Sequence, residues 1–84
     1  MTEVTMPFET AARLHPIAAA TIMRRIDAWR GELIDPPETE IAATRLQMLD
    51  GKLQLVALVL TDFTDDEGIA YTVAFAAPIN PVVH

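Results

Sequence analysis

The clearest pattern along the chain is a helical one over residues 17–34. Apolar side chains recur there at the i, i+4, i+8, i+11 and i+15 spacing that places them on one face of a helix. These residues are Ala18, Ile22, Ile26, Trp29 and Leu33. Pro16 suits the first helical position, where its missing N–H costs no hydrogen bond, and Asp35-Pro36-Pro37 ends the pattern because a residue before proline avoids the helical region. The sequence therefore predicts one long amphipathic helix.

The pattern over residues 41–60 predicts a β-hairpin. Asp50-Gly51 is a strong signal for a two-residue turn, and such a turn places Leu49 opposite Lys52. Apolar residues then pair along one face of both strands, which is a demanding test of register. These pairs are Met48–Leu53, Leu46–Leu55, Thr44–Ala57 and Ala42–Val59. A helix over residues 36–49 stays open as an alternative, because Asp35-Pro36-Pro37-Glu38 resembles a helix-capping box.

A third strand is predicted over residues 69–77, because large and small side chains alternate there. Its larger residues, Ile69, Tyr71, Val73 and Phe75, fall on one face. The segment before it, residues 61–68, is polar and is predicted to be a loop.

The N-terminal segment gives weaker signals. Residues 1–8 are predicted to form an extended arm or an edge strand, since Pro7 is tolerated at a sheet edge, and residues 9–14 a short helical turn. The expected fold is α+β: a single small domain, residues 1–84, in which one long amphipathic helix packs on a three-stranded antiparallel β-meander.

The second face of this predicted sheet is more apolar than a solvated face should be. It carries Ile41, Ala43, Leu58 and Leu60 from the hairpin. We expect the N-terminal arm to cover part of it, and an interface with a second copy or with another partner to cover the rest.

The amino-acid composition excludes several kinds of catalytic and metal-binding site. The 84-residue chain has neither cysteine nor serine, so disulfides, thiolate metal sites and Ser or Cys nucleophiles are excluded. Its histidines, His15 and His84, have no partner at ligand spacing. A calcium loop starting at Asp62 would need glycine at its sixth position, and Gly68 falls at the seventh. We therefore expect a protein that is not an enzyme and that has no catalytic, cofactor-binding or metal-ligating residues.

Charge and hydropathy narrow the classes of partner. The formal net charge is −6, which repels phosphate backbones and disfavours direct binding of nucleic acid. No apolar run approaches the length of a membrane helix, and the N-terminus lacks the pattern of a secretory signal. We expect a cytoplasmic protein that binds no membrane.

Acidic residues gather in two predicted loops, and an aromatic residue lies within the second. Such a residue flanked by carboxylates is suited to anchor an interface, although it can equally fold back over the core. The candidate partner-binding residues are Asp62, Phe63, Asp65, Asp66, Glu67, Glu38 and Glu40. The competing interpretation is that loops simply carry charge for solubility.

The chain is short, acidic, free of cysteine and free of motifs, and it has acidic stretches over residues 32–40 and 62–67. In this overall profile it resembles small phage-encoded inhibitors of host defence, of the anti-CRISPR kind. The resemblance implies a nucleoprotein surveillance complex in the host cytoplasm as the partner, with the acidic loops competing for its basic nucleic-acid groove. The alternative function is a structural or assembly protein that forms homodimers through the second sheet face.

Overall fold

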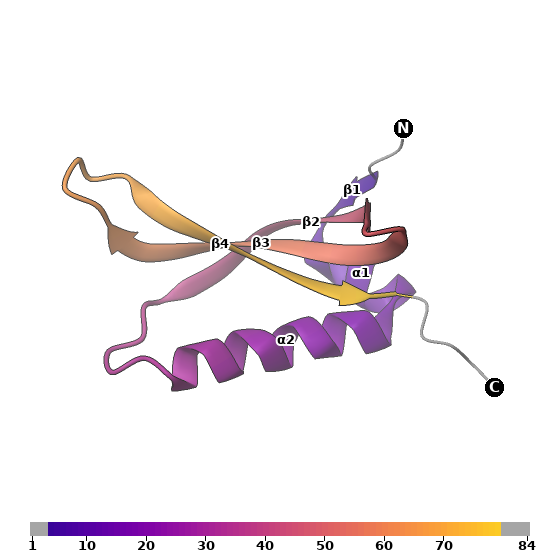
Figure 1. The fold of residues 1–84 in the computed structure, drawn as a ribbon, viewed down its shortest axis with the longest axis horizontal. Coiled ribbons are helices and arrows are strands. Elements are labelled where there is room, and N and C mark those ends of the chain that lie inside the picture. Colours follow the sequence, from indigo (N-terminus) through magenta and orange to yellow (C-terminus); the bar gives the residue numbers. More distant parts are fainter. Residues whose placement is uncertain (1–3, 80–84) are drawn as a thin grey trace.

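The computed structural model describes residues 4–79, which form two helices and a four-stranded antiparallel sheet in the order β1-β2-β3-β4. The elements are β1 (Val4–Met6), α1 (Phe8–Leu14), α2 (Pro16–Gly31), β2 (Thr39–Leu49), β3 (Lys52–Thr64) and β4 (Ala70–Pro78). Figure 1 shows α2 running along one side of the sheet. The α+β class agrees with the sequence, but the prediction of one helix on a three-stranded sheet is wrong.

The additional strand and helix both come from the N-terminal segment. β1 pairs with β2 through Val4 opposite Leu46 and Met6 opposite Thr44, so it extends the sheet and does not cover its second face. The buried Thr44 hydroxyl donates a 2.7 Å hydrogen bond to the carbonyl of Met6, which satisfies a polar group at a core position. A strand of three residues is too short to show a pattern in the sequence. It is stable only through its pairing with β2, which the sequence does not reveal.

The two helices are separated by a single residue. His15 has a non-helical conformation (φ −135°, ψ 67°), as expected before a proline, and α2 then begins at Pro16 as predicted. α2 ends at Gly31, three residues before the predicted end. The amides of Glu32 and Leu33 bond to carbonyls three residues back, which tightens and closes the last turn.

The predicted hairpin and most of its register are confirmed. Asp50 (φ 53°) and Gly51 (φ 76°) both have positive φ, as a type I′ turn requires, and Leu49 lies opposite Lys52. The helical alternative for residues 36–49 is therefore wrong. The predicted pairing holds as far as Thr44 opposite Ala57, and fails at Ala42–Val59.

A β-bulge causes this failure. The register shifts between Ile41 and Ala43, so that Ile41, and not Ala42, lies opposite Val59. The extra residue turns Ile41 to the helix side of the sheet, where it packs against the core. Ile41 had been expected on the second face, and the bulge reverses that assignment.

The second hairpin is longer and tighter than predicted. β3 continues to Thr64, and β4 begins at Ala70, one residue later than expected. The polar loop predicted over residues 61–68 is thus reduced to residues 65–69. The side chain of Asp65 closes this short turn, as described below.

The core lies between the helices and one face of the sheet. Ile22, Leu55 and Val59 are its largest fully buried apolar side chains, and the rings of Trp29 and Phe75 meet edge-on at 5.9 Å between centroids. The core cluster includes Leu55, Ala57 and Val59 of β3 but none of the alternating residues between them. Both helices therefore pack on the same face of the sheet.

Candidate functional site

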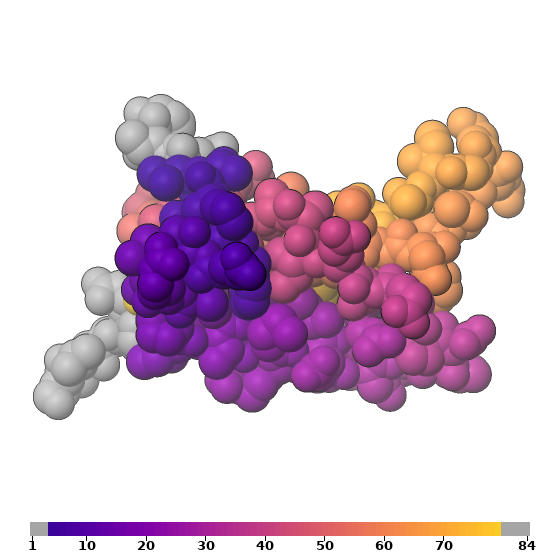
Figure 2. Space-filling view, turned by 180° about the vertical axis from the view of Figure 1, so that it is seen from behind, coloured from indigo at the N-terminus to yellow at the C-terminus, as the bar shows by residue number. Residues whose placement is uncertain are grey.

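The end of the β3–β4 hairpin extends beyond its neighbouring strand. Pairing between β2 and β3 stops at Thr39 opposite Thr61, so the hairpin continues past that point as two strands. Residues 62–71 are called the arm here. In Figures 1 and 2 the arm projects from one end of the molecule, on the side of the sheet away from α2.

The arm combines negative charge with exposed apolar surface. Its four carboxylates are unaccompanied by any Lys or Arg within residues 62–71. Three large apolar side chains on it are exposed to solvent: Phe63 by 39%, Tyr71 by 52% and Ile69 by 61%. These three residues are not among the side chains packed on the core cluster. Exposed apolar side chains gathered with charges are typical of a surface that binds another protein.

The carboxylates of the arm have different roles. Asp65 accepts hydrogen bonds from the backbone N–H groups of Glu67 (2.8 Å) and Ile69 (3.0 Å), and Gly68 adopts a φ of 83° to complete the turn. Asp65 therefore shapes the arm. Asp66 and Glu67 are exposed at its tip and present their charge to solvent.

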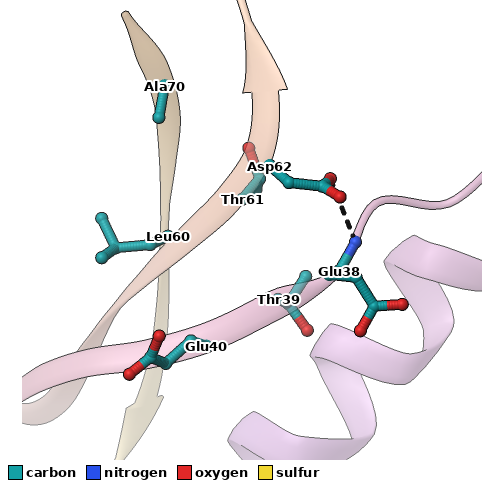
Figure 3. A pocket seen from close by; sticks show the side chains of 7 residues that line it. All are labelled: Glu38, Thr39, Glu40, Leu60, Thr61, Asp62 and Ala70. Atoms are coloured by element: carbon teal, nitrogen blue, oxygen red, sulfur yellow. Dashed lines mark hydrogen bonds between the residues drawn. The ribbon is translucent and has the colours of Figure 1, made fainter.

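The two acidic stretches meet at the base of the arm. The Asp62 carboxylate accepts a 3.1 Å hydrogen bond from the backbone N–H of Glu38 (Figure 3). The Asp62 N–H in turn donates to the Glu38 carbonyl at 3.3 Å. An open hollow of about 450 Å³ lies here. Its lining residues are Glu38, Thr39, Glu40, Leu60, Thr61, Asp62 and Ala70. The sequence did not reveal this meeting, because it depends on where the β2–β3 register ends.

The sequence-predicted residues thus form one region with two parts. Asp62 joins Glu38 and Glu40 at the hollow, whereas Asp66 and Glu67 lie at the tip of the arm. Phe63 lies within β3 between the two, although it had been expected in a loop. The exposed Ile69 and Tyr71 were missed as candidates, because their alternation with small residues indicated a strand packed on the core.

The part of the chain that the structure describes shows neither a cluster of metal-ligating side chains nor a membrane-spanning helix. Within residues 4–79, no three His, Asp or Glu side chains are placed to hold a metal ion. None of the helices in that range is long and apolar enough to cross a membrane. His84 lies outside the described residues, and His15 joins the two helices.

Comparison with known proteins finds no match to this chain among family models, curated proteins or solved structures.

Proposed function

We propose that the chain is a non-enzymatic protein-binding module whose arm docks on a basic surface of a larger protein. The observation that carries this proposal is the projection of three exposed apolar side chains together with four carboxylates on one narrow hairpin. In protein interfaces, buried aromatic anchors supply most of the affinity. Complementary charges increase the association rate and select the partner. The arm offers both kinds of group on one element.

The partner we propose is a complex that handles nucleic acid, and the chain acts on it as an inhibitor of the phage type. A protein groove that binds phosphates is lined by Lys and Arg, whose charge attracts the carboxylates of the arm. Asp66 and Glu67 at the tip would occupy positions that phosphates otherwise take. The net charge of −6 adds a long-range attraction toward such a surface.

Site-specific photo-crosslinking tests whether the arm makes the contact. A photoreactive phenylalanine replaces Phe63 in one variant and the exposed Ile17 of α2 in the other, and each is irradiated in lysate of the source or its host. We expect a covalent adduct with one large basic protein from position 63 and none from position 17. Nucleic acid added before irradiation should suppress the adduct. Crosslinking from position 17 alone would place the contact on the helix and contradict the proposal.

Charge neutralisation then tests the mechanism on the partner so identified. The double variant Asp66→Asn/Glu67→Gln removes tip charge and leaves the turn-forming Asp65 in place. We expect the Kd to rise about tenfold at low salt, and the difference from the wild type to shrink as salt screens exposed charges.

The matched control is Asp27→Asn/Glu32→Gln, which removes the same charge from exposed positions near the helix. An equal loss of affinity in both double variants would mean that net charge, and not the arm, drives binding.

A further inference from the structure

The second face of the sheet is apolar and carries no helix in the described chain; Leu60 and Ala74 on it are exposed to solvent, whereas Val56 is buried. Its residues form three rows across the strands, as the pairing of β2, β3 and β4 shows. The middle row is Ala43–Leu58–Ala74, with Arg45–Val56–Ala76 on one side of it and Glu40–Leu60–Thr72 on the other. These three rows are called the open face here. Both helices pack on the opposite side of the sheet, and the Arg25 guanidinium of α2 reaches the edge of the open face, where it donates to the backbone carbonyl of Ala76.

The two outer rows of the open face differ in shape. Leu60 is 41% exposed and stands out from β3. On the other side of the middle row lies a small hollow of about 130 Å³, a volume on the scale of one aliphatic side chain. The hollow is lined by Thr5, Ala43, Thr44, Arg45, Val56 and Leu58. Leu60 therefore projects on one side of the middle row, and the hollow lies on the other side of that row.

The same two rows also differ in charge. Glu40 is exposed and belongs to the row of Leu60, whereas Arg45 belongs to the row of Val56. Both side chains come from β2, one on each side of Ala43. Arg45 donates from Nε to the Gln47 side chain at 2.9 Å, and both residues lie on the face of β2 opposite to Leu46, which packs on the core.

We propose that a second copy of this chain covers the open face in a two-fold symmetric dimer. The axis lies in the interface, perpendicular to the strands, and passes through the Ala43–Leu58–Ala74 row. This operation lays each outer row on the opposite row of the other copy. Leu60 then enters the hollow beside Val56, and Glu40 faces Arg45. Because the interface is isologous, each of these contacts occurs twice.

General features of packed sheets agree with this arrangement. Two sheets pack face to face at about 10 Å, and the alanines of the open face allow such an approach. An axis parallel to the strands would instead lay β2 over β4, which places Glu40 against Thr72 and leaves no opposite charges facing each other. Charge complementarity therefore favours the axis perpendicular to the strands.

The dimer uses other residues than the proposed function of the arm. The arm, residues 62–71, lies beyond Leu60 and outside the three rows of the open face. In the dimer the two arms lie at opposite ends, each projecting on the side of the second copy, with Asp66 and Glu67 at the tip. The double variant Asp66→Asn/Glu67→Gln should therefore lose binding to a partner of the arm while its own dimerisation stays unchanged.

Measurement of solution mass tests the proposal directly. The full chain is measured by light scattering and sedimentation over about a thousandfold range of concentration. We expect the mass to rise to twice the 9.2 kDa of one chain. A single-chain mass at every concentration would overturn the proposal. A photoreactive residue placed at position 74 that crosslinks to an unrelated protein, and not to a second copy, would overturn it as well.

Charge reversal tests the symmetry of the dimer. Glu40→Arg and Arg45→Glu each place like charges against each other twice, and each should raise the dimer Kd about tenfold. The double variant exchanges the two charges and should restore dimerisation to within about threefold of the wild type. Glu67→Arg, an equal charge change on the arm, is the matched control and should leave the dimer intact.

Two further variants test the packing of Leu60 and the position of the two-fold axis. Leu60→Gln should weaken the dimer while circular dichroism shows an unchanged fold, because its side chain is already solvent-accessible in the single chain. If Glu40→Arg/Arg45→Glu stays as weak as either single variant while remaining folded, the proposed axis is wrong.

Discussion

The two faces of β3 are almost equally apolar in sequence, yet the helix side is fully buried from Leu55 to Val59, whereas burial on the open face ends before Leu60. On the helix side, Leu55 and Val59 are fully buried under α2 and the neighbouring strands. On the open face, Val56 is only 6% exposed, in a row beside Arg45 and Ala76, while Leu60 stands out into solvent. An apolar strand therefore indicates two packed layers, but it does not indicate whether both layers belong to the same chain.

Truncation of one leucine on each face should give the largest contrast. Leu55→Ala should lower the free energy of unfolding by about 3 kcal/mol, because it leaves a cavity in the core. Leu60→Ala, the same substitution on the same strand, should cost less than about 1 kcal/mol in dilute protein. Denaturant titrations of both variants measure the two losses. Equal losses would show that both faces are packed alike within the single chain.

The bulge at Ala42 allows a test of which residues of β2 hold the two faces. Deleting Ala42 makes Ile41 adjacent to Ala43, so regular pairing keeps Ile41 opposite Val59 on the helix side and Glu40 opposite Leu60 on the open face. We therefore expect the deletion to lower the free energy of unfolding by at most about 1 kcal/mol. Thermal unfolding measures it, with Ala42→Gly, which keeps the extra residue, as the control. A loss of about 2 kcal/mol or more would mean that the deletion turns the Glu40 carboxylate toward the core, and would contradict this account of the bulge.

A smaller effect is expected from one hydroxyl on each face. Thr44→Val removes the hydrogen bond to the Met6 carbonyl and should cost about 1 kcal/mol. Thr72→Val, on the exposed row of the open face, should change the stability by less than about 0.5 kcal/mol. The measurement is again denaturant unfolding. Hydrogen exchange at the β1–β2 amides should quicken in the Thr44 variant, and unchanged exchange there would contradict a role for this bond in holding β1.

Sequence reasoning worked best where local chemistry has few solutions. Asp50-Gly51 requires a two-residue turn with positive φ, and this turn alone determines the register of β2 against β3 up to Ala43. The bulge that follows was not predictable, because Ile41-Ala42-Ala43 is apolar throughout and fits either register. Pro16 likewise identified the start of α2, whereas the end of α2 depended on backbone bonds near Gly31.

The parts that sequence reasoning missed depend on contacts between distant segments. β1 is stable only beside β2, and its three residues carry no pattern of their own. The acidic residues of the candidate site were recognised from composition, but their grouping was not. Glu38 meets Asp62 because two strands end together, and Asp65 proved to be a turn residue once its hydrogen bonds were seen.

The order of the strands also has a consequence for the path of folding. β2, β3 and β4 pair with their nearest neighbours through short turns, so these pairs close small loops at low entropic cost. β1 pairs with β2 across an intervening segment that contains both helices, as the pair Val4–Leu46 shows. We expect such a meander to form from its local hairpins first, with the N-terminal strand joining last. The rate-limiting step is therefore expected to be the closure of that long loop, with the C-terminal hairpins already formed.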